Sequence, residues 1–269
     1  MSALVPSFVA KVARAKKHLV DLEHAVEAFA STDPYTVSER VEGKKKRKIR
    51  RLTFTAGPAN TDIPLIAADA IHNLRSSLDH IMSAMVAPKD RGSCQFPIYF
   101  QGVSEPDVPG ENEDRLNQRA RWRSDTKTLP DDAVAALQLM QPRDLDWSDP
   151  EMPILKLLNS LWNTDKHTKL PVVASGMADH RIEFTDANGV VQRGSGELLT
   201  ERHVLENEAE ITGLPYNAVD VKITGTALVG ILVGTEQAKR YVQLPRGLDD
   251  IATVIETEVF PVLTPYVRP

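Results

Sequence analysis

The chain has 269 residues, of which 42% are hydrophobic and 26% are charged, and its formal net charge is -5. This composition predicts a globular protein with one large or two small domains, and it excludes a general basic surface of the kind that binds nucleic acid. One cysteine excludes an intrachain disulfide, residues 1–22 lack the apolar core of a signal peptide, and no apolar run approaches the roughly 20 residues that span a bilayer. We therefore expect a cytoplasmic protein without membrane contacts.

The first third of the chain predicts two long helices separated by a β-hairpin. Apolar residues at helical spacing predict an amphipathic helix over residues 8–30. Strand-like sequences at 35–41 and 49–55 predict a hairpin that occupies about residues 35–56. A second amphipathic helix is expected from about residue 62 to residue 86.

The middle of the chain predicts a long connection followed by two helices. Residues 89–128 are rich in Pro, Gly, Asn and Arg, so we expect an exposed connection with a short helix near residues 113–121. Proline residues at helix-opening positions predict further helices over residues 130–140 and 153–165.

The last third predicts strands and then a closing amphipathic helix over residues 248–263. The candidate strands lie at 171–175, 181–185, 189–193, 220–233 and 239–243. The whole pattern predicts an α+β protein: an amphipathic helical bundle with an inserted basic β-hairpin (residues 1–168), then a β-rich part with a C-terminal helix (residues 169–269), both of which can pack as one unit.

The predicted helix at residues 62–86 carries an unusual polar face. Its apolar residues share one side, and the opposite side gathers Asp69, His72, Asn73, Ser76, Asp79, His80 and Ser83, with Arg75 at the border. Solvent-facing helices usually carry Lys and Glu, so a face of His, Asn, Ser and Asp indicates groups that meet partners or a substrate.

A second polar helix is predicted at residues 153–165. Asn159, Asn163 and Lys166 fall within one narrow arc, with His167 at its edge. The two polar helices can satisfy each other's buried hydrogen-bonding groups, which is a purely structural role, or they can form a composite site. The sequence favours neither alternative, but both predict that the helices touch, with Asn73 or His80 within reach of Asn159, Asn163, Lys166 or His167.

Arg75, the polar Ser76 and His80 together resemble the Arg-x4-6-His motif of the HEPN superfamily of helical-bundle proteins. More of the chain, residues 69–170, is similar to a broad group of uncharacterised bacterial and phage proteins. The segments that carry this second resemblance are residues 72–80, Gln95-Phe96-Pro97-Ile98, residues 137–142 and Asp165-Lys166-His167.

The HEPN resemblance implies a metal-independent endoribonuclease in a toxin or phage-defence context. His80 would be the acid or base, Arg75 would hold the phosphate, and Ser76 would hydrogen-bond it. Asp79 or Asn73 would fix the imidazole tautomer. Five residues apart on a straight helix, Arg75 and His80 diverge by about 140°. The resemblance therefore also implies a homodimer in which two motif helices face each other.

The segment Lys44-Lys45-Lys46-Arg47-Lys48-Ile49-Arg50-Arg51 is the strongest local concentration of charge. On a hairpin these residues could follow an RNA backbone. The alternative is a solvated turn whose charge prevents the hairpin from pairing with other chains. The run lacks interleaved aromatic residues that would stack on bases.

Glycine-rich nucleotide loops and paired cysteine motifs are absent from the sequence, so no metal and no cofactor is expected. The leading functional hypothesis is therefore a metal-independent endoribonuclease that acts on RNA. The alternative is a non-catalytic module that binds nucleic acid or protein.

Overall fold

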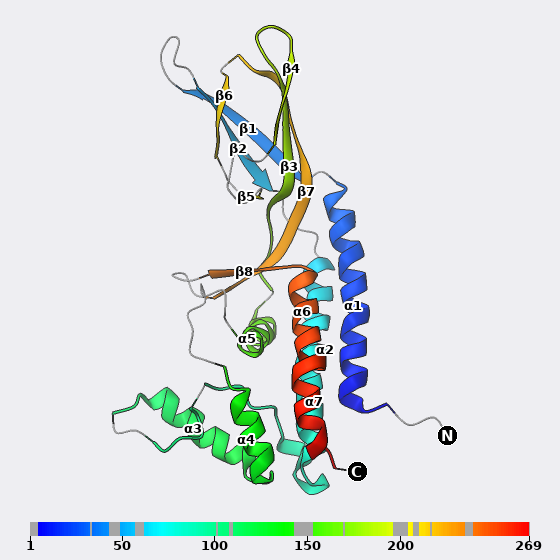
Figure 1. Ribbon diagram of the computed structural model, residues 1–269, viewed down its shortest axis with the longest axis vertical. Coiled ribbons are helices and arrows are strands. Elements are labelled where there is room, and N and C mark those ends of the chain that lie inside the picture. The colour runs from blue at the N-terminus through cyan, green and yellow to red at the C-terminus, as the bar shows by residue number, and fades with distance from the viewer. Residues whose placement is uncertain are drawn as a thin grey trace. The chain divides into compact units, whose positions relative to one another are not determined.

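Helices and antiparallel strands make up the computed structural model (Figure 1). It describes residues 5–32, 34–42, 49–56, 62–100, 102–107, 110–142, 153–168, 170–195, 204–206, 210–215, 217–234 and 239–268. The α+β class predicted from the sequence is confirmed.

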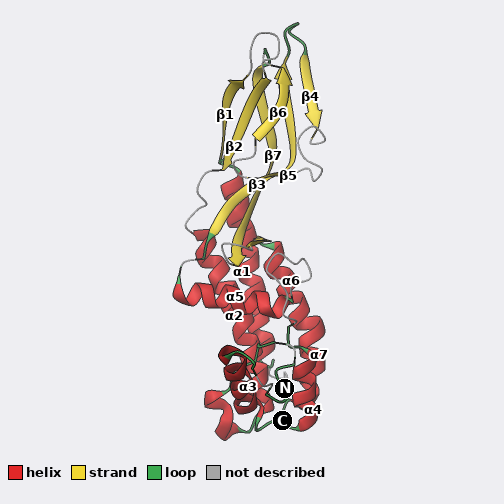
Figure 2. Ribbon diagram, turned by 90° about the vertical axis from the view of Figure 1, so that its left-hand side faces the viewer, coloured by secondary structure: helices red, strands yellow, loops and turns green. Residues whose placement is uncertain are grey.

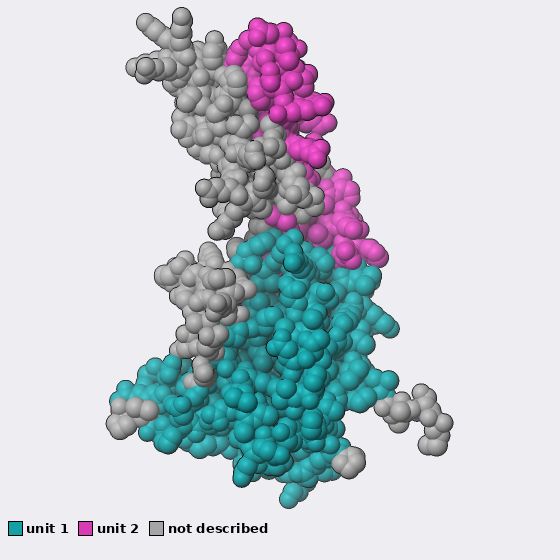
Figure 3. All heavy atoms as spheres, viewed as in Figure 1, with its two compact units in different colours: residues 1–22, 64–171, 232–269 teal, residues 23–63, 172–231 magenta. Residues whose placement is uncertain are grey.

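The chain forms two units, each built from separate stretches of sequence (Figure 3). Unit 1 comprises residues 1–22, 64–171 and 232–269, and unit 2 comprises residues 23–63 and 172–231. The predicted hairpin thus belongs to the same unit as most later strands, whereas the closing helix belongs with the central helices. Figure 2 distinguishes the helices from the strands by colour.

The helices include all those expected from the apolar spacing. They are α1 (Ser7–Ala30), α2 (Asp62–Met85), η2 (Pro88–Ser93), α3 (Glu113–Thr126), α4 (Asp131–Leu139), α5 (Ile154–His167), α6 (Arg246–Val254), η4 (Ile255–Val259), α7 (Phe260–Leu263) and η5 (Thr264–Tyr266). The segments α6, η4 and α7 follow one another without a break, so they form the predicted closing helix with a π-helical middle. None of the described helices is both long enough and apolar enough to cross a membrane.

The centre of unit 1 forms around the apolar side of α2. The side chains of Ile71, Leu74, Leu78 and Ile81 are fully buried, as the helical spacing predicts. Burial of each such side chain stabilises the fold by about 1.5–3 kcal/mol. Elsewhere in the unit, the ring of Phe8 on α1 packs edge-on against Phe260 on α7, with 4.9 Å between the ring centroids.

The strands form two antiparallel sheets. They are β1 (Tyr35–Glu42), β2 (Ile49–Ala56), β3 (Val172–Thr185), β4 (Val191–Ser195), β5 (Val204–Glu206), β6 (Glu210–Pro215), β7 (Val219–Gly234) and β8 (Lys239–Gln243). The first sheet has the order β1-β2-β6, and the second has the order β4-β3-β7-β8, with β5 also pairing with β3. The predicted hairpin is confirmed by the pairing from Tyr35↔Ala56 to Glu42↔Ile49.

The connection after α2 differs from the sequence-based expectation. We expected residues 89–128 to be mostly exposed and irregular, but Phe96, Phe100 and Val103 are buried. Helix α3 extends to Thr126, five residues beyond the expected end at residue 121. The predicted connection is therefore in part a packed component of unit 1.

Candidate functional site

Arg75 is buried on α2, with 3% of its surface exposed. One guanidinium nitrogen donates to the carboxylate of Asp79, one turn later, and the other donates to the carbonyl of Phe96 over 2.9 Å. Asp79 also accepts a hydrogen bond from the backbone N–H of Phe96, at 2.8 Å. Arg75 and Asp79 therefore satisfy the backbone carbonyl and the backbone N–H of Phe96, as a neighbouring strand would in a sheet.

The same connection is fixed by Gln141, which lies just after the end of α4 and is also buried. Its amide oxygen accepts from the backbone N–H of Tyr99 at 2.8 Å, and its amide nitrogen donates to the carbonyl of Pro97 at 3.1 Å. Three of the segments that carry the resemblance to uncharacterised proteins thus meet around residues 96–99. This arrangement gives those segments a structural role.

The two polar helices meet through an aromatic ring. The guanidinium of Arg75 lies 5.1 Å from the ring centroid of Trp162 on α5, and the amine of Lys166 lies 3.8 Å from it. Such contacts contribute about 0.5–2 kcal/mol each. The expected contact between the helices therefore exists, but it is made by Arg75 and Trp162 and not by the amides.

The remaining residues of the second polar helix lie apart from Arg75. Asn159 is half-buried and Asn163 is exposed. His167 and Lys166 line a pocket of about 360 Å³ with Asp165, Thr168 and residues of α2 and the chain after α5. Among the described residues, no hydrogen bond joins the helix to Asn73, whose side chain donates to the carbonyl of Asp69 at 2.8 Å.

His80 lies in different surroundings from Arg75. It is half-buried and lines an open pocket of about 310 Å³. The pocket is walled by the start of α1, the end of α2 and η2, and its lining residues are Ser7, His80, Ser83, Ala84 and Arg91. We call it the His80 pocket. Arg75 does not line it, so the structure separates the arginine and the histidine of the predicted motif.

The environment of His80 favours its neutral form. Burial lowers its pKa below the usual 6.5, the positive charge of Lys11 on α1 lowers it further, and Asp79 opposes this shift. The surroundings therefore favour the neutral imidazole, which has one donor and one acceptor nitrogen.

The cations near His80 have no intramolecular counter-charges. In the described part of the chain, neither Lys11 nor Arg91 forms an ion pair, and the side chains of Ser7 and Ser83 form no hydrogen bond. The last turn of α2 beside the pocket is fixed by Arg268, which donates from its backbone N–H to Ala84 and from its side chain to Met85, both at 3.0 Å. The lining of the pocket thus carries hydrogen-bond donors that no group of the described chain uses.

Two other predicted groups can be placed only in part. Ser76 is half-buried on α2, near the Arg75 pair in sequence. The basic run is described only at its end, because Lys44, Lys45, Lys46, Arg47 and Lys48 lie outside the described residues. Arg50 and Arg51 belong to strand β2. The proposal that this run binds RNA is therefore untested.

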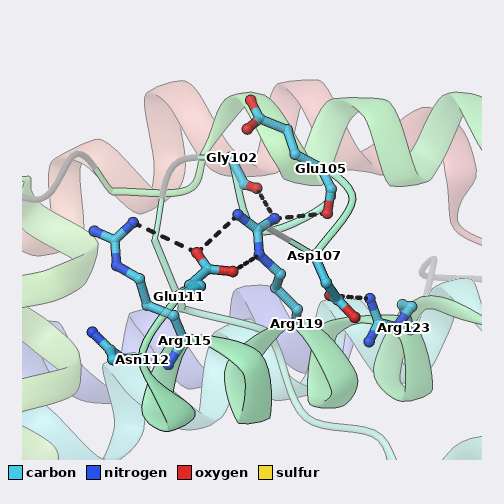
Figure 4. Close-up of polar contacts among 8 residues, drawn as sticks. All are labelled: Gly102, Glu105, Asp107, Glu111, Asn112, Arg115, Arg119 and Arg123. Atoms are coloured by element: carbon cyan, nitrogen blue, oxygen red, sulfur yellow. Dashed lines mark hydrogen bonds and ion pairs between the residues drawn. The ribbon is translucent and has the colours of Figure 1, made fainter. Parts of the chain in front are cut away.

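A buried cluster around Arg119 on α3 was missed from the sequence (Figure 4). Its guanidinium donates to both carboxylate oxygens of Glu111, at 2.8 and 3.1 Å, and to the carbonyls of Gly102 and Glu105. It also lies over the ring of Phe100, 5.2 Å from the centroid. These contacts order the connection. The one signal in the sequence was Asn112, which caps α3 by accepting from Arg115 N–H.

The surroundings of Cys94 favour its protonated thiol. Burial and the nearby carboxylates of Asp125, Asp79 and Asp90 raise its pKa to about 11. The thiol therefore stays protonated, and only the thiolate is reactive.

Comparison of the chain with protein-family models, with curated proteins and with solved structures finds no match.

Proposed function

We propose that the protein binds nucleic acid and that the His80 pocket holds one of its phosphate groups. The observation that carries the proposal is that Arg91 and His80 line the same open pocket, whereas Arg75 is buried and paired. The role expected of Arg75 is thereby transferred to Arg91, which reaches the pocket from η2. RNA is the polymer that the HEPN resemblance implies.

Charge supports an anionic ligand. Lys11 and Arg91 lie near one imidazole and, within the described residues, have no carboxylate partner. Unpaired positive charges repel each other, so binding an anion removes an unfavourable interaction and adds favourable ones. Arginine is well suited to phosphate because its planar fork of donors matches two phosphate oxygens.

The neutral lining residues supply the remaining hydrogen bonds. The hydroxyls of Ser7 and Ser83 can each donate to a phosphate oxygen, and the neutral imidazole of His80 can donate from one nitrogen. Together with Arg91, these three groups come from three elements of unit 1, α1, α2 and η2, so the fold of that unit holds the donors in place.

The experiment is a binding titration with fluorescent single-stranded RNA. Arg91→Gln should weaken binding about 10- to 100-fold, because a hydrogen bond to a charged group contributes about 1.5–3 kcal/mol. Lys17→Gln is the matched control, since Lys17 is an exposed cation of α1 that does not line the pocket. Equal loss in both variants would show only a general charge effect and would contradict the proposal.

The basic hairpin needs its own variant. If residues 44–51 also contact phosphates, then changing Lys45, Arg47 and Arg50 together to Gln should lower the salt dependence by about 0.7 units of log-log slope per lost contact. Unchanged affinity and salt dependence would identify the run as a solvated turn. It would leave the pocket proposal standing, because the pocket lies in unit 1.

A second candidate is the metal-independent endoribonuclease. The observation that favours it is the lowered pKa of His80, which leaves an unprotonated imidazole at neutral pH that can accept the proton of an RNA 2′-hydroxyl. A partner copy would then have to supply the group that protonates the leaving oxygen, since His80 is the only imidazole lining the described pocket.

Incubating RNA with the protein in EDTA separates the two candidates. Cleavage that is lost in His80→Ala and retained in the Lys17→Gln control would establish the nuclease. Intact RNA, bound with the dependence on Arg91 described above, would establish a non-catalytic binding protein.

A further inference from the structure

We infer that the His80 pocket recognises a phosphate monoester, the terminal phosphate of an RNA, in preference to the diesters within the strand. This inference rests on the proposed function, because it specifies which phosphate the pocket takes.

The charge around the pocket matches a monoester better than a diester. A phosphate monoester carries about -1.5 to -2 charges at pH 7, whereas a diester carries a single charge. Arg91 lines the pocket, and Lys11 on α1 adds a second positive charge near His80, while the nearby carboxylate of Asp79 is already paired with Arg75. No ion pair in the described chain neutralises Lys11 or Arg91. A diester would leave one of these charges uncompensated, but a monoester matches both.

The number of hydrogen-bond donors in the pocket lining also fits a monoester better than a diester. The three terminal oxygens of a monoester accept more hydrogen bonds than the two free oxygens of a diester. The described lining offers two hydroxyls, one imidazole and one guanidinium, all without intramolecular partners. A terminal phosphate uses this set more fully, and a donor that loses water on binding without gaining an acceptor weakens the complex.

The described lining of the pocket has no side chain suited to recognising a base. Among its described members, Ser7, His80, Ser83, Ala84 and Arg91, there is no Phe, Tyr or Trp to stack on a base and no Asn or Gln to read a base edge. The pocket volume of about 310 Å³ is at the lower limit for a small-molecule site. It therefore fits a phosphate with its attached sugar better than a length of stacked strand.

The test uses RNA oligonucleotides of one sequence that differ only at their ends. Oligonucleotides with a 5′-phosphate, with a 3′-phosphate and with hydroxyls at both ends are titrated against the full chain. We expect one phosphorylated form to bind about 10-fold more tightly than the form with two hydroxyls. The preference should vanish in Arg91→Gln and Ser83→Ala and remain in Lys17→Gln.

The outcomes separate the inference from the proposed function. If all three RNAs bind equally but still depend on Arg91, the pocket takes a diester, and the monoester inference is overturned while the proposed function stands. If inorganic phosphate and a nucleoside monophosphate bind in an Arg91-dependent way but RNA of any end does not, the proposed function fails and monoester recognition stands. Failure of every phosphate ligand to bind overturns both.

Discussion

Arg75 and His80 are five residues apart on one helix, but they have different roles in the structure. Arg75 uses its guanidinium within the fold, on Asp79, on the Phe96 carbonyl and on the Trp162 ring. His80 faces an open pocket with Arg91 and two serines. The two residues predicted to act together therefore differ: Arg75 is structural, and His80 is available to a ligand.

Arg75→Ala should destabilise the protein because it leaves the Phe96 carbonyl without its buried donor and Asp79 without its counter-charge. Breaking such an arrangement costs about 3 kcal/mol in the free energy of unfolding. Urea denaturation measures this change, and Ser76→Ala, at the half-buried neighbouring position, is the control, with an expected change within about 0.5 kcal/mol. An Arg75→Ala protein with wild-type stability would show that the network does not hold the connection.

Lys11→Gln should raise the pKa of His80 by removing the nearby positive charge that disfavours the imidazolium. Burial is the largest cause of the lowered pKa, so the pKa in the variant should still lie below 6.5. Titration of the His80 imidazole by NMR measures both values. An unchanged pKa in Lys11→Gln would contradict the electrostatic effect of Lys11 on His80.

The sign of the shift also fixes how stability depends on pH. Because the folded state disfavours the imidazolium, the unfolded chain takes up a proton more readily as the pH falls below 6.5. The contribution of His80 to the free energy of unfolding is therefore complete above about pH 6.5 and is lost as the pH falls through its folded-state pKa. His80→Gln should remove this part of the pH dependence, as pH-dependent urea denaturation can show.

At the scale of elements, the connection between α2 and α3 is held by buried arginines at both ends. Arg75 binds the backbone of Phe96, and Arg119 binds the carbonyls of Gly102 and Glu105 together with Glu111. Buried side chains thus replace the backbone ladder that a strand or a helix would provide. The connection carries no periodic pattern for this reason, and the sequence therefore predicted an exposed loop.

Arg119→Ala should loosen this connection much more than Arg123→Ala. Arg119 is 2% exposed and binds four oxygen atoms, whereas the ion pair of Arg123 with Asp107 has about half of each side chain exposed. We expect a loss of about 3 kcal/mol or more for Arg119→Ala and of at most about 1 kcal/mol for Arg123→Ala. Hydrogen exchange of the amides at residues 102–107 reports the local effect, and equal exchange in the two variants would refute the clamp.

The elements that the sequence predicted are those with local signals. Helices α1 and α2 have apolar residues at helical spacing, and the hairpin has paired strand-like runs around polar residues. Strand β6 was not predicted, because it pairs with β2 through residues far apart in sequence, such as Leu52 and Ile211. Strand β3 was predicted as two short strands, although it continues from Val172 to Thr185 with irregular register against β7.

At the scale of the whole molecule, each unit combines distant parts of the chain, and the candidate site depends on this. The His80 pocket needs the first turn of α1, the last turns of α2 and η2 together. The polar face of α2 identified His80 and Ser83 from spacing alone. Arg91 and Lys11 could not be recognised in the same way, because only tertiary packing brings them to His80.

The central claim is that the His80 pocket holds a phosphate group, and histidine NMR during a titration with 5′-phosphorylated RNA tests it most directly. Phosphate binding should shift the His80 imidazole resonances and raise the pKa of His80, because the anion stabilises the imidazolium. The resonances of His72, which is exposed on the same helix and does not line the pocket, serve as the internal control. Saturable shifts of His80 that are absent in Arg91→Gln are the predicted result, and RNA binding that leaves the His80 resonances and pKa unchanged would contradict the claim.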